Sequence, residues 1–360
     1  MSDALTTPEQ VQAVVGQLNA PRDLKVIDHL DSHAQRWIGL SPLVCLTLSQ
    51  DTDISVTLGG GPQGFVQIPD AHHLLLPLAL LDDSAAVRSG ASFGALLLVS
   101  GMNETLRING TVLAIEGDIA RLQVAECFLH CAKALMRSDF WQPASSPSTP
   151  TQPSAFLAAS RFMTLATQAA DGSADLSPKG DPAGALLKAS EQHVCFADRP
   201  GNRRIDSFRN IVSQPRIALL AMIPGCLQVV EACGTAELST SDNLRAAFRV
   251  REATPKLVTR MSVDSIALRH SPALARARLW PVVGAPAGLN GADIFKAHIQ
   301  LNRSGGEAGD KVRAAIAVHV GHAARKGGVV GPAAGDGAVT ESAIGRHRRT
   351  EAHLAASGEF

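Results

Sequence analysis

Arginines gather in one short stretch of the sequence, DRPGNRRIDSFRNI, which runs from Asp198 to Ile211 directly after the apolar run HVCFA. Pro200 and Gly201 predict a turn, and the residues after them have the pattern of a helix. Guanidinium forks, an amide and a hydroxyl at a helix start suit a phosphate dianion. A solvated basic helix face has the same composition, so both interpretations stay open. The polar residues concerned are Arg199, Asn202, Arg203, Arg204, Ser207 and Arg209.

Lys179, in the segment SPKGDP, adds a further cation. It follows the preceding predicted strand, and from there it can converge on the same anion as the arginines. This second segment favours the phosphate interpretation over a plain basic surface.

A third group of polar residues lies in ETLRING, which holds Arg107, and in HCAKALMRS. His130, Lys133 and Arg137 recur at helical spacing, so they share one face of a helix. An ordinary charged surface helix explains them equally well. A metal site is not indicated, because His130 and Cys131 are adjacent and would point apart on a helix.

The predicted strands and helices around these residues occur twice in the chain. RLQVAECFLHCAKALMRSDFW (121–141) aligns without a gap with RMSVDSIALRHSPALARARLW (260–280). GMNETLRINGTV (101–112) aligns with GCLQVVEACGTA (225–236), and TLSQDTDISVTLGGGPQG (47–64) with TQAADGSADLSPKGDPAG (167–184). The three matches keep the same order, so the sequence predicts two copies of one domain.

The predicted organisation has five parts. An N-terminal segment covers 1–22, the first domain covers 23–143, and a Pro/Ser/Thr-rich linker covers 144–154. The second domain covers 155–285. The remaining 286–360 hold few large apolar residues, and we expect them to be largely disordered.

Short apolar runs at close spacing with few helices predict a mainly β fold built of small closed barrels. The glycines within LRINGTVLAI and LQVVEACGTAEL predict a bulge or a close backbone approach. Lysines and arginines balance aspartates and glutamates at 33 each, which argues against a nucleic-acid binder. No membrane-length apolar run, secretory signal or CxxC pair occurs, so we expect a cytoplasmic protein with reduced thiols.

SPKGDPAG, DRPGNRRIDSFRNI and QPRIALLAMIPG strongly resemble the pyridoxamine 5′-phosphate oxidase-like FMN-binding split-barrel flavoproteins. GMNETLRINGTV and HCAKALMRSDFW in the first copy resemble the second half of the same pattern. The resemblance implies two tandem split β-barrels packed as a pseudo-dimer. It also implies FMN at their interface, with one barrel binding the phosphate and the other covering the ring.

The two copies have diverged unequally. The first has Gly59 where the second has Lys179, and it lacks a GNRR segment. The second has VVEACG in place of LRING and ALRHSPALARA in place of FLHCAKALMRS. Together they make one complete FMN site, and we expect the opposite interface to stay empty.

The resemblance assigns roles to particular residues. Cofactor binding falls to Ser177, Lys179, Gly180, Asn202, Arg203, Arg204 and Ser207, with Arg107 and Arg137, and catalysis to His130 and Lys133. The implied activity is an FMN-dependent oxidoreductase acting on a small conjugated or cyclic molecule, with NADH or NADPH as a candidate electron donor. Oxidation of pyridoxamine phosphate itself is not indicated. The alternative is a non-catalytic flavin or haem binder, and further homodimerisation stays open.

Overall fold

The computed structural model describes residues 3–17, 24–143, 150–201 and 203–326. The chain divides into two units, Met1–Ser304 and Gly305–Phe360. Both sheets lie in the first unit, and the described part of the second is helix α10 (Gly306–Lys326). Within the described residues, no helix combines the length and apolar character needed to cross a membrane.

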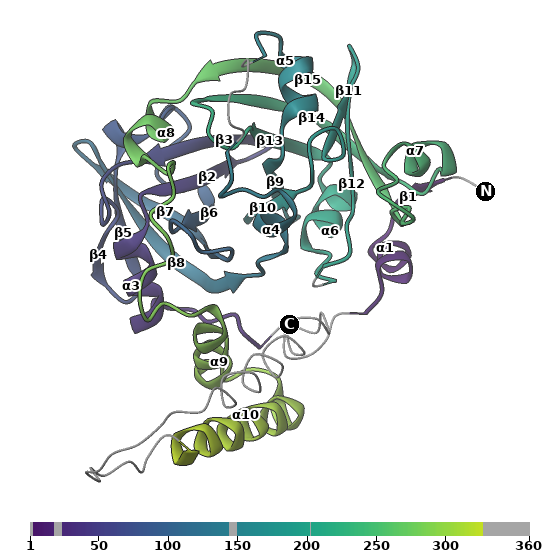
Figure 1. Cartoon of the computed structure of the whole chain (residues 1–360). Coiled ribbons are helices and arrows are strands. Elements are labelled where there is room, and N and C mark those ends of the chain that lie inside the picture. The colour runs from purple at the N-terminus through teal and green to yellow at the C-terminus, as the bar shows by residue number, and fades with distance from the viewer. Residues whose placement is uncertain (1–2, 18–23, 144–149, 202, 327–360) are drawn as a thin grey trace, which may run out of the picture. The chain divides into compact units, whose positions relative to one another are not determined.

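The first barrel is a seven-stranded antiparallel sheet with the order β3-β2-β6-β7-β8-β5-β4 (Figure 1). Its large buried side chains include Trp37 on helix α3 and Phe93 on β6. Its elements are α3 (Ser32–Leu40), β2 (Leu43–Gln50), β3 (Asp53–Gly60), β4 (Gln67–Asp70), β5 (His73–Pro77), the 3-10 helix η1 (Leu78–Leu80), β6 (Ser92–Leu98), β7 (Thr105–Glu116), β8 (Ile119–His130) and α4 (Lys133–Arg137).

The second barrel repeats this strand order, as β10-β9-β13-β14-β15-β12-β11, and β1 is added to β14. The predicted mainly β architecture of two tandem barrels is therefore confirmed. Its elements are β1 (Ala4–Leu5), α1 (Pro8–Val15), α5 (Pro153–Ala159), β9 (Phe162–Gln168), β10 (Ala174–Gly180), β11 (Leu187–Ala189), β12 (His193–Ala197), α6 (Asp206–Ser213), β13 (Arg216–Met222), β14 (Gln228–Ser239), α7 (Asp242–Ala247), β15 (Val258–His270) and α8 (Pro272–Ala277).

The two glycines that predicted a bulge occupy equivalent places in the two barrels. The register of β7 against β8 shifts between Asn109 and Gly110, and that of β14 against β15 shifts between Cys233 and Gly234. A Cβ on either glycine would overlap a carbonyl oxygen of the neighbouring strand. Both expected features, bulge and close approach, are confirmed.

Each barrel packs closely against a short helix of the other barrel. Gly60 at the end of β3 lies against the backbone of Ala273 on α8, and Gly180 at the end of β10 lies against that of Ala134 on α4. Each barrel thus receives the short helix that follows the other barrel's last strand. Between them lies an apolar core drawn from both, in which the rings of Phe140 and Phe162 are 4.9 Å apart.

Gly60→Ala should destabilise the protein by about 1–3 kcal/mol, because a Cβ there forces α8 away from β3. Urea unfolding measures the loss. Gly39→Ala is the matched control, since Gly39 lies inside helix α3 with open space around it. That change should be neutral or stabilising by up to about 1 kcal/mol. Equal effects of the two substitutions would contradict the close packing of α8 on β3.

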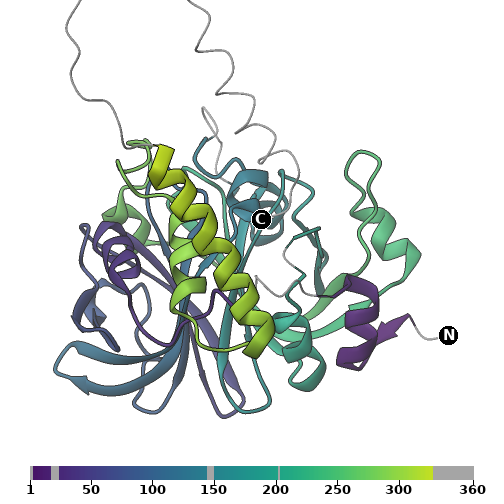
Figure 2. The same ribbon diagram turned by 90° about the horizontal axis from the view of Figure 1, so that it is seen from below.

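Two segments outside the predicted domains each pack on the barrel that is farther from them in the sequence. β1 and α1, from the predicted N-terminal segment, belong to the second barrel, where Val11 and Val15 join the core. Figure 2 shows them beside that barrel and away from the first-barrel strands. Helix α9 (Gly291–Leu301), by contrast, packs on β8 and adds Ile294 to the first-barrel core.

The prediction that 286–360 is largely disordered is wrong for α9 and α10. In α9 a few apolar side chains suffice for ordering, because the first barrel supplies the rest of their contacts. Composition alone does not reveal a helix that is stabilised mainly by tertiary packing. Residues 327–360 lie outside the described part of the chain.

Candidate functional site

A cavity lies where the two barrels meet. β7, the end of β8 and α4 contribute from the first barrel, and β10, the end of β12 and the start of α6 from the second. The predicted site residues that line it are Arg107, His130, Lys133, Arg137, Ser177, Lys179, Gly180, Arg204 and Ser207. The fold thus brings together nine of the eleven residues singled out in the sequence.

The other two predicted residues are not placed in the lining. Asn202 lies outside the described residues. Arg203 is exposed and has a positive φ of 60°, and its Cδ lies 3.6 Å from the place a Cβ would take on Gly16. The side chain of Arg203 therefore lies beside the end of α1, while its neighbour Arg204 lines the cavity.

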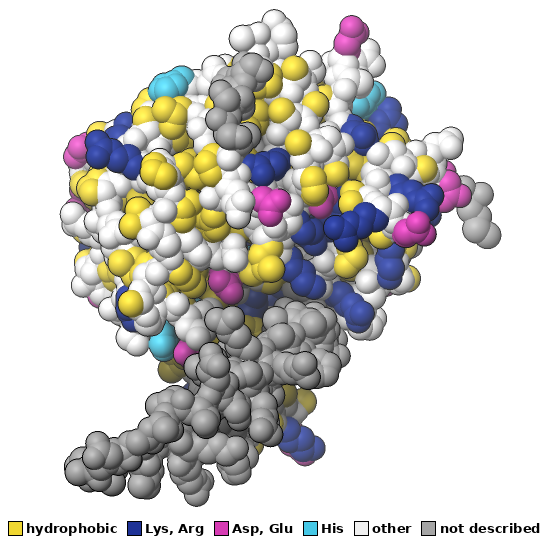
Figure 3. All heavy atoms as spheres, viewed as in Figure 1, with side chains coloured by type: hydrophobic (Ala, Val, Ile, Leu, Met, Phe, Trp, Pro, Cys, Tyr) yellow, Lys and Arg dark blue, Asp and Glu magenta, His cyan; other side chains and the backbone are white. Residues whose placement is uncertain are grey.

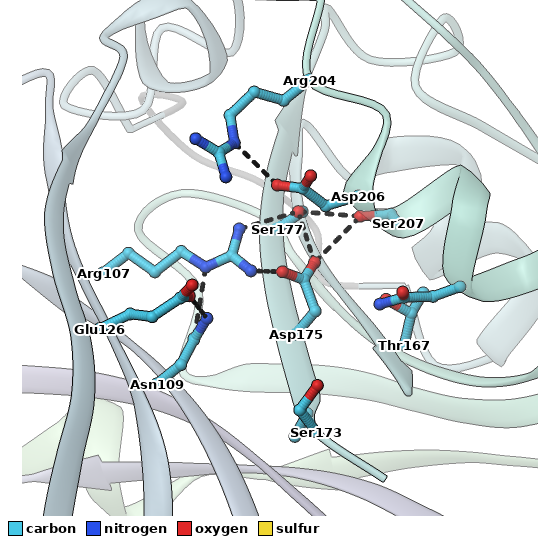
Figure 4. A network of polar contacts seen from close by, with 12 residues as sticks. Arg107, Asn109, Glu126, Thr167, Ser173, Asp175, Ser177, Arg204, Asp206 and Ser207 are labelled. Carbon is cyan, nitrogen blue, oxygen red and sulfur yellow. Dashed lines mark hydrogen bonds and ion pairs between the residues drawn. The ribbon is translucent and has the colours of Figure 1, made fainter. Parts of the chain in front are cut away.

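A polar network crosses the interface at the back of the cavity (Figure 4). Arg107 from the first barrel forms an ion pair with Asp175 on β10, and both side chains are buried. Ser177 Oγ donates to Asp175 Oδ2 at 3.1 Å, and Ser207 Oγ donates to Ser177 Oγ at 2.9 Å. Nearby, Arg204 Nε donates to Asp206 Oδ2 at 2.7 Å. The network fixes the two barrels to each other with charged groups.

Sequence reasoning missed Asp175 and Asp206. A signal for Asp175 existed, because Asp175, Ser177 and Lys179 alternate along one strand and so share one face of the sheet. Burial tends to raise the pKa of Asp206, but the charge and hydrogen bond of Arg204, with the charge of Arg107, bring it below its ordinary value. Asp206 therefore remains an anion that holds Arg204 in place.

Positive charge exceeds negative charge around the cavity. Among the described lining residues, six are lysine or arginine and three are aspartate, namely Asp181, Asp198 and Asp206. Figure 3 shows lysine and arginine side chains gathered over the same part of the molecule, around α6. An excess of cations in a concave, partly buried site favours an anionic ligand.

The four lining arginines already have protein partners. Arg107 pairs with Asp175, Arg204 with Asp206, and Arg199 with Asp181 and with two backbone carbonyls. Arg137 Nε donates to the carbonyl of Gly180 at 3.1 Å, and its Nη1 donates to that of Pro200 at 3.1 Å. Their charge acts on the cavity, but much of their donor capacity is used.

The two lining lysines differ from the arginines. Within the described chain, the side chains of Lys133 and Lys179 make no hydrogen bond or ion pair. The ammonium of Lys179 lies 5.2 Å from the ring centroid of Phe208 and 5.8 Å from that of Phe196. Burial lowers its pKa, which the charge of Asp198 partly opposes. One lysine from each barrel is thus available to a ligand.

His130 ends β8 at the cavity wall. Its Nδ1 is buried and has no hydrogen-bond partner among the described residues. Burial, followed by the charges of Lys25 and Arg107, lowers the pKa of the imidazole well below its ordinary value. His130 is therefore a neutral ring with an unsatisfied nitrogen, able to accept or donate one hydrogen bond to a ligand.

The cavity volume is about 90 Å³. Sites that enclose a whole drug-sized molecule measure roughly 300–1,000 Å³. The cavity therefore encloses only part of such a ligand, and the cations in its lining select an anionic group for that part.

The pseudo-equivalent place at the opposite interface is filled by the chain itself. Leu81 lies against Gly59, so it covers the position that corresponds to Lys179. The carboxylate of Asp82 accepts hydrogen bonds from Ser271 Oγ and from the backbone of Ala273. Internal partners thus satisfy the groups that a ligand would otherwise meet.

Arg137 is not special to the first copy, contrary to the expectation from the sequence. Arg276 stands at the same place of the aligned segments, and its Nε donates to the carbonyl of Gly60 at 2.8 Å. Arg137 makes the corresponding bond to Gly180. Because an arginine makes this hydrogen bond at both interfaces, the bond fixes the short helix to the end of the strand whether or not a ligand lies beside it.

Residues 150–278 match the family model described as pyridoxamine 5′-phosphate oxidase. No curated protein matches the chain. Among solved structures, a putative pyridoxamine 5′-phosphate oxidase from Lactobacillus delbrueckii is 19% identical, with 35% of this chain and 99% of that chain covered and a TM-score of 0.27.

Two further structures show similar overlap. HupZ from Group A Streptococcus is 22% identical, with 31% of this chain and 88% of that chain covered and a TM-score of 0.26. A pyridoxamine 5′-phosphate oxidase-related, FMN-binding protein from Nostoc punctiforme is 13% identical, with 33% and 79% covered and a TM-score of 0.23. Because these scores are low, the assignment rests on the family match. Residues 150–278 are therefore similar to the pyridoxamine 5′-phosphate oxidase family.

Proposed function

We propose that this protein binds FMN in the cavity between its barrels and acts as an FMN-dependent oxidoreductase on a small conjugated or cyclic molecule. The observation that supports it best is a pair of lysines, Lys179 from the second barrel and Lys133 from the first, whose side chains have no hydrogen bond or ion pair among the described residues. Placed in a net-positive cavity, they suit a doubly charged phosphate.

The residues divide into two groups by chemistry. Lys179, Arg204 and the hydroxyls of Ser177 and Ser207 would hold the phosphate, because they supply charge and donors on one side of the cavity. Bound FMN would supply the capacity for electron or hydride transfer. From the first barrel, His130 offers a neutral hydrogen-bonding ring and Lys133 a positive charge.

The purified protein should be yellow, with close to one FMN per chain, because the opposite interface is filled by Leu81 and Asp82. Absorbance after heat release of the flavin measures the ratio. A ratio near two, or failure to take up added FMN, would contradict the proposal. Oxidation of NADH or NADPH by the loaded protein tests the oxidoreductase part separately.

Haem binding is a second candidate, favoured by one observation. A neutral imidazole whose buried Nδ1 has no partner among the described residues, as in His130, is also the group that ligates haem iron. A Soret band that His130→Ala removes, together with no flavin absorbance, would select this candidate over FMN.

Two neighbouring arginines provide a sharp test of the site. Arg204→Ala should weaken FMN binding by roughly 10- to 100-fold, since a hydrogen bond to a charged group contributes about 1.5–3 kcal/mol. Arg203→Ala should leave the affinity within about twofold, because its side chain is exposed and lies beside Gly16. Fluorescence titration measures both. Equal losses of affinity would contradict the assignment of Arg204, and not Arg203, to the FMN site.

FMN affinity should fall as the pH rises above neutral. A bound phosphate favours the protonated form of Lys179, so affinity is highest below the pKa of this lysine and is lost as the pH passes through it. Because burial lowers that pKa, the fall should begin below the ordinary lysine value of about 10.4. Titrations from about pH 7 to about pH 9.5 measure it. Lys179→Arg should flatten the profile, and an unchanged slope would exclude Lys179 as its origin.

A further inference from the structure

Three cations converge on the ring of Phe128. Lys25 Nζ lies 5.1 Å from the ring centroid, Arg107 Cζ 5.2 Å and Arg204 Cζ 5.1 Å. The ring is fully buried, and Lys25 and Arg107 are nearly so. The three come from different parts of the chain: the segment before α3, strand β7 and the loop before α6. A single aromatic side chain thus lies beside cations from both barrels.

The position of Phe128 explains how this convergence arises. Phe128 and Arg107 are directly opposite each other on β8 and β7, so their side chains leave the same face of the sheet. Arg204 reaches the same ring from the other barrel. Burial lowers the pKa of Arg107 to about 10, and repulsion from Arg204 contributes to the shift. The face of an aromatic ring carries partial negative charge, which offsets repulsion between cations held beside it.

The opposite interface provides an internal comparison. The residues equivalent to Arg107 and Phe128 are Glu231 and Ala267, which are likewise directly opposite each other on β14 and β15. The interface that the chain fills with its own side chains has therefore lost the cation and the aromatic ring together. This joint loss links the ring to the arginine and to the open cavity.

We propose that Phe128 is a positioning residue, whose ring holds Arg107 and Arg204 close together across the interface and keeps Arg204 directed into the cavity. The effect on FMN rests on the proposed function. The coupling between Phe128 and Arg204 does not, and it can be measured in the protein without a ligand.

A fluorinated phenylalanine series at position 128 tests the proposal with little change of shape. Fluorine withdraws charge from the ring face, so FMN affinity should fall stepwise, reaching about a tenfold loss with pentafluorophenylalanine. The same series at Phe93, a buried first-barrel phenylalanine on β6, should leave affinity unchanged. Equal affinities along the series at position 128 would overturn the proposal.

A double-mutant cycle in ligand-free protein gives an independent measurement. Each substitution should change the unfolding constant by some factor. In the double variant Phe128→Leu/Arg204→Met, the combined factor should be smaller than the product of the two single factors by at least about threefold. Phe93→Leu with Arg204→Met should show no such coupling. Independent effects of Phe128→Leu and Arg204→Met would overturn the proposal. A coupled pair in a protein that takes up no FMN would instead leave Phe128 in its role and reject the proposed function.

Discussion

Lys179→Met should weaken FMN binding by about 10- to 100-fold, a loss of affinity as large as any that we expect from a single substitution. The ammonium lies in a net-positive cavity and has no hydrogen bond or ion pair within the described chain. Within the described chain, the charge of Asp198 acts on this ammonium without forming an ion pair with it, so the ammonium can still pair with a phosphate. Methionine keeps the length and the apolar stem of the side chain, so the change isolates the charge.

The same substitution should not destabilise the ligand-free protein. Lys179 is a half-buried cation beside two aromatic rings, and burial lowers its pKa although the charge of Asp198 opposes this. Replacing it with an apolar side chain should leave the urea midpoint unchanged or raise it. A lysine with a structural role would behave in the opposite way, with loss of stability and no separate effect on FMN.

Lys188→Met is the matched control. Lys188 lies in the same barrel, but it is exposed and donates to the carbonyl of Gly184, with its ammonium 5.5 Å from the ring centroid of Phe248. Its loss should leave FMN affinity within about twofold. If both lysine variants bind FMN as tightly as the unaltered protein, the phosphate position is elsewhere.

The architecture could be predicted from the sequence because the signals for it are local or repeated. Two aligned copies, each with short apolar runs, specify two similar sheets, and the glycines at positions 110 and 234 marked the bulges. The same holds for most of the cavity. Lys179 and Arg204 belong to short segments in which several functional residues are adjacent, so one resemblance located them together.

What the sequence concealed depends on contacts between distant segments. In the sequence Phe128 is an ordinary apolar strand residue, because its contact with Arg204 comes from the other barrel. Helix α9 likewise depends on its packing against β8. Arg203 and Arg204 are the same residue type in adjacent positions, but Arg203 has a positive φ and only Arg204 lines the cavity among the described residues. No pattern of residue types carries such information.

Arg107→Met should destabilise the protein by about 3–5 kcal/mol, the largest effect on stability that we expect, because it leaves the buried carboxylate of Asp175 without its cation. Ser177 would still donate to this carboxylate, but a neutral hydroxyl does not replace a charge. The loss should appear as a lower urea midpoint in ligand-free protein.

Adding the second substitution Asp175→Ser should restore much of that stability. At the opposite interface, the residue equivalent to Asp175 is Ser55, and the residue equivalent to Arg107 is not an arginine. Removing both charges of a buried pair is commonly close to neutral, whereas removing one is costly. The double variant should therefore lie well above Arg107→Met in urea unfolding. If Arg107→Met costs less than about 1 kcal/mol, or if Asp175→Ser adds to the loss instead of relieving it, then the ion pair does not join the barrels, and Arg107 belongs with the residues reserved for the ligand.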